Sequence, residues 1–592
     1  MKKRLLAAAL SLSLLTGCGG QALELPEAPA EAAGIAYVPL DDRPDNVGRV
    51  QYLAESLGYT LEMPERDLYR TALDGQPANG NGTQCGDRGL LYEWVLTQEE
   101  NGCDRYILFL DQLLSGGLVS SRHMARHEDI TLSDGTVLTE YELLDRLLTT
   151  LAADGNNQVW LLESVMRLAP TCGYDGFGLD EYNALRAYGM ESRPELSSDG
   201  LGLERVLELY GKGGDGEALA AEDFGLTAET VADYCSARSR KLELTDRVFR
   251  TLGQLGNEGD PDLSDARFQV LIGIDDSSAE DSIQKNEIAY LRSLLREGDT
   301  ILSGVDDLAF KAVTKLYLSE SGWQGADVNV QYFGGTEDRP ACDYDAQPLT
   351  EIVAEHLDYF GLTEEETPAF ADLYLLVLTQ PEEASQKETY IKELVRRLKE
   401  LQKADLPVIL MDAGNGQYGT AFHEALIKET ELGGLLSYAG FLDMAIVTGT
   451  ALSHGVARYA HLAAGETSQT EEAAFRKTLA DSVLKDLCYK HIVREEILSY
   501  VRGELGGDPN NFWQPDIDRE AVLDRLETGM EAATAKVLQN LERSAVMIGL
   551  EPHAGSTWAE WGGITLSSFT FPWDRAFEID MTITVDPLTR LR

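Results

Sequence analysis

The segment Phe268-Gln-Val-Leu-Ile-Gly-Ile-Asp-Asp-Ser-Ser278 decides how the rest of the chain is interpreted. Its apolar run stops abruptly at two adjacent carboxylates, Asp275 and Asp276. A short apolar run with polar boundaries predicts a strand that is buried on both faces. In open α/β sheets and in α/β barrels, ligands bind at the carboxyl ends of such strands. The segment therefore predicts a parallel sheet with a functional site at these two aspartates.

Other apolar runs along the chain end in the same way. The acidic residues that follow them are Asp41 and Asp42, Asp111, Glu163, Asp306 and Asp307, and Asp412. A single acidic strand end is usually a loop residue or a helix N-cap. Six acidic ends at the same structural position instead predict one acidic cleft at one edge of a parallel sheet.

Strand and helix patterns alternate along most of the chain, which predicts an α/β protein with parallel sheets and flanking helices. The candidate strands number about ten, more than the eight of a simple barrel. We therefore expect one or two doubly wound sheets, with a barrel-like core as the alternative. Ala445–Val447 is a further candidate strand, and Phe569–Val585 alternates as an antiparallel strand would.

The 592 residues are too many for one ordinary core, so several domains are expected. The predicted parts are a signal peptide (1–17), a tether (18–33), a first α/β unit (34–171), a helical insertion (172–262), a second α/β unit (263–463) and a helical region with a C-terminal strand (464–592).

The start of the chain carries a targeting pattern. Met1-Lys-Lys-Arg4 is positively charged, Leu5–Leu15 is apolar, and Leu15-Thr-Gly-Cys18 resembles a bacterial lipobox. The apolar run is too short to span a bilayer. We expect Cys18 to be lipidated after removal of residues 1–17, which places the mature protein outside the cytoplasm on a membrane. An ordinary signal peptide with a chance cysteine is the alternative.

The charge balance limits the possible partners. The chain has 50 basic and 100 acidic side chains, a formal net charge of −50. Such a surface repels phosphate backbones, so nucleic acid is excluded as a partner and a small molecule or glycan is expected. Membrane contact is expected only through the lipid at Cys18. The cysteines form no CxxC pair, and no cofactor is predicted.

Carboxylates on different strands suit general acid and base catalysis, as in most glycosidases. We predict Asp111, Asp275 and Asp276 as the catalytic residues. Oxygen ligation of Ca²⁺ or Mg²⁺ by clustered acidic residues is the competing use. His123 and His127 are spaced i,i+4 but lack the HExxH glutamate, so they favour a solvated helix face and no metal is predicted.

Side chains around the strand ends are predicted to bind substrate. Arg43 can hold a neighbouring carboxylate in a fixed direction, and a Gly-Gly pair lets backbone approach a ligand closely. Arginines beside an acidic cleft also suit an anionic sugar such as a uronate or sialic acid. The predicted substrate-binding residues are Asp41, Asp42, Arg43, Gly116, Gly117, Arg122, Arg167, Asp306, Arg339, Asp412, Asn415, Arg575 and Glu578.

Several of these segments resemble the bacterial family DUF4127, a domain of unknown function. The matching segments are Tyr37–Pro44, Asp111–Arg122, Met166-Arg167, Gly273–Asp276, Glu337–Pro340, Asp412 with Asn415-Gly416, and Pro572–Glu578. The resemblance spans nearly the whole mature chain and implies no established activity. Gly440–Thr450 departs from the family, which tends to have a Trp-Asn-Thr segment and a further Asn before a Gly-Thr.

The sequence thus predicts an extracytoplasmic, lipid-anchored hydrolase, with a glycosidase as the favoured class. A solute-binding lipoprotein without catalytic activity is one alternative, and a metal-dependent hydrolase is the other.

Overall fold

The structure is a computed structural model. It describes residues 32–73, 77–80, 82–125, 127–172, 177–257, 267–278, 281–440, 444–512, 514–551 and 555–588, together with 23, 25 and 26. The predicted signal peptide and the lipidation site Cys18 lie outside the described residues. None of the described helices has the length and apolarity that are needed to cross a membrane.

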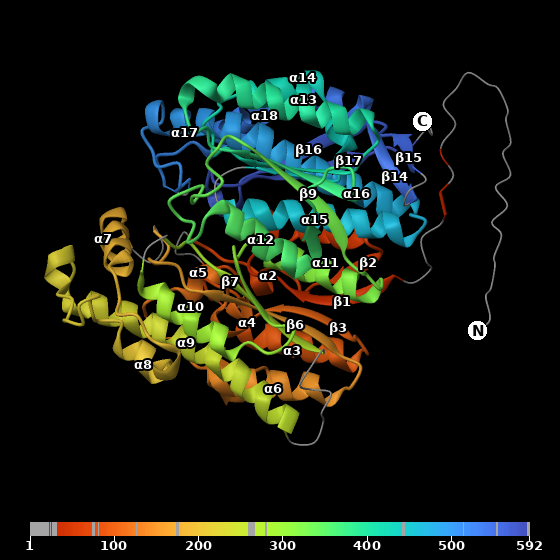
Figure 1. The fold of residues 1–592 in the computed structure, drawn as a ribbon. Coiled ribbons are helices and arrows are strands. Elements are labelled where there is room, and N and C mark those ends of the chain that lie inside the picture. Colours follow the sequence, from red (N-terminus) through yellow and green to blue (C-terminus); the bar gives the residue numbers. More distant parts are fainter. Residues whose placement is uncertain are drawn as a thin grey trace, which may run out of the picture.

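Two parallel sheets organise the molecule (Figure 1). The first has the order β2-β1-β3-β6-β7-β8 and the second the order β10-β9-β11-β12-β13. The strands of the first sheet are β1 (Ala33–Val38), β2 (Tyr59–Glu62), β3 (Arg105–Phe109), β6 (Gln158–Val165), β7 (Phe268–Ile274) and β8 (Thr300–Ser303). Those of the second are β9 (Ala326–Phe333), β10 (Leu362–Glu364), β11 (Leu373–Thr379), β12 (Val408–Ala413) and β13 (Ser437–Gly440).

The strand order confirms the predicted α/β class with parallel sheets. In each sheet the first strand lies between the second and the third, which is the doubly wound arrangement with a switch point beside the first strand. The described residues contain no closed barrel. The predicted unit boundary at residue 263 does not match the sheets, because β7 and β8 hydrogen-bond into the first sheet.

Helices between the two sheets form a shared middle layer (Figure 1). These helices are α1 (Gly48–Ser56), α11 (Leu308–Glu320), α12 (Leu349–Phe360) and α15 (Met444–Ala464). One continuous cluster of buried side chains joins this layer to the facing sides of both sheets, from Tyr37 of β1 to Ile409 of β12. The two sheets therefore share one hydrophobic core and are not separate lobes.

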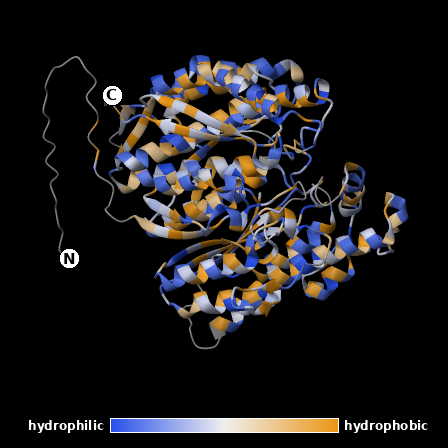
Figure 2. Ribbon diagram, turned by 180° about the vertical axis from the view of Figure 1, so that it is seen from behind, coloured by the Kyte–Doolittle hydropathy of each residue, from blue (hydrophilic) through white to orange (hydrophobic). Residues whose placement is uncertain are grey.

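The outer faces of the sheets are covered by other helices. The first sheet is covered by α3 (Arg88–Glu100), α4 (Leu110–Ser115), α6 (Glu140–Ala153), α9 (Ala228–Asn257) and α10 (Ile283–Leu294). The second is covered by α13 (Lys387–Lys403), α14 (Ala421–Glu429), α16 (Gln469–Ser482), the π-helix η7 (Val483–Val493), α17 (Arg494–Gly503) and α18 (Arg519–Arg543). In Figure 2 the outer helices alternate between hydrophilic and hydrophobic residues along their length, as expected for helices with one face against a sheet and the other in solvent.

Alternation along the strands explains why their sequences are continuously apolar. In β11, Leu375 and Val377 belong to the shared core, whereas Leu376 and Leu378 belong to the outer cluster. Successive side chains of a strand point to opposite faces, so a strand with helices on both sides needs apolar residues at every position.

Small elements complete the chain. They are α2 (Arg66–Tyr69), α5 (Leu118–Ser121), α7 (Leu179–Met190), α8 (Leu203–Glu208), the hairpin strands β4 (Ile130–Thr131) and β5 (Val137–Leu138), and the antiparallel pairs β14 (Ala545–Glu551) with β15 (Gly555–Glu560) and β16 (Ile564–Thr570) with β17 (Asp580–Val585). The helices α7, α8 and α9 lie between β6 and β7 in the chain, within the predicted helical insertion.

Two local predictions were wrong. Ala445–Val447 lies in α15, and the fifth strand of the second sheet is β13. A three-residue apolar run fits a helix as well as a strand, and here the helix continues for 21 residues. Phe569–Val585 is not one strand, because a short helical turn at Pro572–Asp574 separates the end of β16 from β17.

The shared core predicts that the two sheets unfold together. Leu375→Ala should destabilise the protein by about 2–5 kcal/mol, the usual cost of a large-to-small change in a core. Urea denaturation followed by circular dichroism should show one transition that moves to lower urea. Phe370→Ala is the control, because this side chain is 71% exposed, and it should change stability by less than about 0.5 kcal/mol. Two separate transitions would contradict the continuous core.

Candidate functional site

The carboxyl ends of the strands in the first sheet open into a cavity of about 380 Å³. Segments from the second half of the chain form its opposite wall. The charged lining residues are Arg43, Arg122, Arg167, Asp275, Asp276, Asp306, Arg494, Arg575 and Glu578. The aromatic lining residues are Tyr344, Trp573 and Phe577.

Arg43 joins two strand ends. Its Nη2 donates to Asp41 at 2.8 Å and to Asp306 at 2.6 Å, and its Nη1 donates to the second oxygen of Asp306 at 3.0 Å. Its guanidinium carbon lies 4.9 Å from the ring centroid of Trp573. Burial alone would lower the pKa of Arg43, but Asp306 and Asp41 outweigh it and raise the pKa. The loops after β1 and β8 are therefore fixed to each other by a planar, permanently charged group.

The carboxylates after β7 are each paired with an arginine. Asp275 forms an ion pair with Arg122, and Asp276 forms one with Arg167. The side chain of Asp276 is 19% exposed and that of Asp275 is 8% exposed, so Asp276 is more accessible from the cavity. Both carboxylates are held in fixed directions by these pairs.

A buried ion pair supports this side of the cavity from behind. Arg238 of α9 pairs with Glu287 of α10, and its guanidinium also donates to the backbone carbonyls of Met166 and Arg167 at 3.1 and 2.7 Å. The helical insertion thus positions the backbone that carries Arg167. Through these hydrogen bonds, α9 of the helical insertion supports the site structurally.

The C-terminal segment forms the opposite wall. Trp573 and Asp574 have φ angles of 55° and 51°, in the left-handed region that non-glycine residues rarely adopt. The indole Nε1 of Trp573 donates to Asp42 at 2.8 Å, which holds the ring against Arg43. Strained backbone of this kind persists where the surrounding contacts determine it, and it is common at ligand sites.

Glu578 is the lining carboxyl with the most perturbed environment. It is 4% exposed, and burial followed by the nearby carboxylate of Asp45 raises its pKa well above the usual range. Burial alone would raise the pKa of Asp45 too, but Lys485 and Arg49 outweigh it and hold that pKa well below its usual range. Within this pair Glu578 therefore binds a proton more readily than Asp45, and Glu578 lines the cavity.

Half of the residues predicted for catalysis and substrate binding line this cavity. Those that line it are Arg43, Arg122, Arg167, Asp275, Asp276, Asp306, Arg575 and Glu578. Asp41 and Asp42 lie directly behind it, as the partners of Arg43 and Trp573. Arg494 and Tyr344 also line the cavity, and no sequence pattern pointed to either of them.

The remaining predicted residues lie elsewhere. Asp111 is fully buried and does not line the cavity, because it pairs with Lys241 of α9 together with Glu163. Gly116 has a φ of 83°, and a Cβ atom there would lie 2.8 Å from the sulfur of Cys85, so it meets a packing constraint. Neither Gly117 nor Arg339 lines the cavity, and the Arg339 side chain is 55% exposed.

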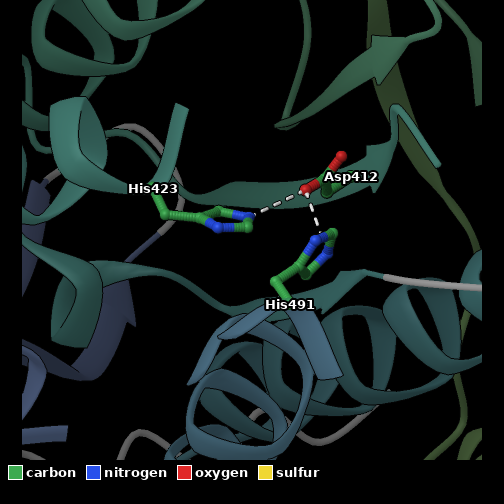
Figure 3. A group of neighbouring side chains, drawn as sticks. All are labelled: Asp412, His423 and His491. Carbon is green, nitrogen blue, oxygen red and sulfur yellow. Dashed lines mark hydrogen bonds and ion pairs between the residues drawn. The ribbon is translucent and has the colours of Figure 1, made fainter. Parts of the chain in front are cut away.

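Asp412 lies in β12 of the second sheet and Asn415 in the turn that follows it, and neither lines the cavity. Asp412 is at the end of β12, where it contacts His423 of α14 and His491 of η7 (Figure 3). Burial, followed by His423, lowers the pKa of His491 to about 4. The predicted single acidic edge is therefore divided between two sheets.

Comparison with known proteins identifies the family. The family model described as "Protein of unknown function (DUF4127)" matches residues 35–582. The chain belongs to the DUF4127 family. Searches of curated proteins and of solved structures each found no match. The DUF4127 match covers the two sheets and the C-terminal wall of the cavity, and it assigns no reaction.

The buried cluster around Lys241 predicts a large effect on stability. Lys241→Met leaves Asp111 and Glu163 buried without their cation, so unfolding should become easier by about 3–5 kcal/mol. Urea denaturation measures the change. Lys392→Met removes a 71% exposed partner of Glu388 and should cost less than about 0.5 kcal/mol. Equal stability of the two variants would show that Asp111 is not part of a buried ion cluster.

Proposed function

We propose that this DUF4127 protein is a hydrolase that cleaves glycosidic bonds of anionic glycans outside the cytoplasm, anchored to the membrane through a lipid on Cys18. The observation that carries the proposal is a buried carboxyl with a raised pKa, Glu578, in the same cavity as the arginine-paired carboxylates Asp275 and Asp276. The location rests on the lipobox-like segment around Cys18.

Two carboxyl groups in different protonation states are what glycoside hydrolysis requires. Glu578 would donate a proton to the oxygen of the leaving group. Asp276, the more accessible of the two paired aspartates, would act as base or nucleophile, with Asp275 beside it. In place of Asp111, which lies in the Lys241 cluster, Glu578 is therefore the proposed acid.

The arginines of the cavity favour an anionic substrate. Arg43, Arg122, Arg167, Arg494 and Arg575 all line the cavity of a chain in which acidic residues outnumber basic ones by 100 to 50. Guanidinium groups bind carboxylates in a bidentate manner. Trp573 offers an aromatic face beside them. A uronate or sialic acid combines a carboxylate with a sugar ring and fits both features.

The two alternatives have weaker support. A solute-binding protein that closes on its ligand needs lobes that move, whereas here one continuous core joins the two sheets. A metal-dependent hydrolase needs ligands at the cavity, whereas Asp275, Asp276 and Asp306 are each paired with a guanidinium. Turnover that persists in a chelator separates the proposal from the second alternative.

Single substitutions should separate turnover from binding. Glu578→Gln and Asp276→Asn should each lower kcat on aryl uronides or sialosides by about 10²-fold or more, because each removes one half of the acid–base pair. Substrate affinity, measured by calorimetry, should be retained by Glu578→Gln. Asp338→Asn is the control, since that side chain is 80% exposed in a loop, and it should leave kcat unchanged. Binding without turnover by the unsubstituted protein would favour a solute-binding function.

The protonation state of Glu578 predicts the pH profile. The raised pKa means that Glu578 is protonated below that pKa and loses its proton as the pH rises through it, so kcat/KM should fall on the alkaline side. Asp45→Asn removes the neighbouring negative charge that raises this pKa, so the alkaline limb should move to lower pH. A limb that does not move in Asp45→Asn would contradict the role of Glu578 as the acid.

A further inference from the structure

Three side chains from three elements converge outside the cavity (Figure 3). The Nε2 atom of His423 lies 3.2 Å from Oδ2 of Asp412, and Nε2 of His491 lies 4.0 Å from the same oxygen. One ligand atom from each residue lies within 4.8 Å of the other two. The second oxygen of Asp412 accepts the backbone N–H of Gly414 at 3.0 Å, which turns Oδ2 towards the two imidazoles.

These distances are close to those around a small metal ion. Zinc–nitrogen and zinc–oxygen bonds of roughly 2.0–2.1 Å in a tetrahedral site separate the ligand atoms by about 3.3 Å. A modest movement of the His491 ring would bring its 4.0 Å separation to this value. The rings of His423 and His491 meet edge to face, with centroids 4.4 Å apart and planes at 69°. Because the two planes differ, the nitrogens of one ring need not point in the same direction as those of the other.

Burial makes a cation at this point favourable. Asp412 is 3% exposed and His423 is 2% exposed. A buried carboxylate without a full counter-charge is costly. The carboxylate and each of the two imidazoles can give one lone pair to a divalent ion, which would satisfy all three side chains together.

We propose that Asp412, His423 and His491 bind one divalent transition-metal ion of the zinc class. Mixed imidazole and carboxylate ligands suit such ions, whereas Ca²⁺ and Mg²⁺ prefer oxygen ligands alone. The hydrogen bond from Gly414 is the second-shell contact that orients a metal-bound carboxylate.

The ion would connect the second sheet to the π-helix. It would join β12 and α14 to η7, and His491 lies three residues before Arg494, which lines the cavity. π-Helical segments are rare in proteins overall, and those that occur are often found at functional sites. The metal site does not depend on the proposed hydrolase activity, because none of its three ligands lines the cavity.

The test uses the full chain purified in detergent and stripped of metal with a chelator. Titration with Zn²⁺ by calorimetry should show one equivalent bound, and Co²⁺ should give the visible absorption of a tetrahedral site. Bound Zn²⁺ should raise Tm. His423→Gln combined with His491→Gln should weaken Zn²⁺ binding by about 100-fold or more, since even second-shell changes cost roughly 10–100-fold.

His127→Gln is the matched control, because His127 pairs with Glu140 and lies outside the cluster. This variant should bind Zn²⁺ as the unsubstituted chain does. If the double variant does not fold, Asp412→Asn replaces it and should show the same loss. The proposal fails if the unsubstituted chain binds less than one equivalent, or if binding persists in the folded variants. Hydrolase activity of the metal-free protein is measured separately, because the outcome of the Zn²⁺-binding test does not depend on it.

Discussion

The pairing of guanidinium with carboxylate is the interaction on which the cavity depends. Arg43 binds Asp41 and Asp306 together, and this joins the loop after β1 to the loop after β8 across three intervening strands. Leaving any of these charges buried alone would cost several kcal/mol, so the three side chains are ordered as a unit. Trp573 then packs on the guanidinium, which positions the opposite wall. The shape of the cavity follows from this one group of charges.

The fold could be predicted from the sequence because its strands are buried on both faces. Val270–Ile274 and Val408–Met411 are continuous apolar runs because helices cover both sides of each sheet. The same property made Ala445–Val447 ambiguous, since α15 lies in the middle layer and is apolar too. Sheet membership could not be predicted, because β7 and β8 resemble the strands of either sheet in composition.

The site was predicted in part, and the errors have a common physical cause. An acidic residue directly after an apolar run predicts a position at the carboxyl edge of a sheet. It does not predict which side chain pairs with that residue. Asp111 turns inward because Lys241, 130 residues away, supplies a buried cation. Asp412 likewise lies at the carboxyl end of a strand, but this strand, β12, belongs to the second sheet. Glu578 was predicted to bind substrate, and its proposed role as an acid rests on its burial and on Asp45, which the fold places beside it.

The wall that carries Trp573 and Glu578 comes from the last 21 residues of a 592-residue chain. The other side of the cavity includes Arg43, from near the start of the sequence, and Trp573 reaches across to Asp42, 531 residues earlier. The cavity is therefore complete only when these two distant parts of the polypeptide are packed together. A chain truncated before Trp573 would keep the charged strand ends of the first sheet but lose the indole that lies against Arg43 and the carboxyl of Glu578.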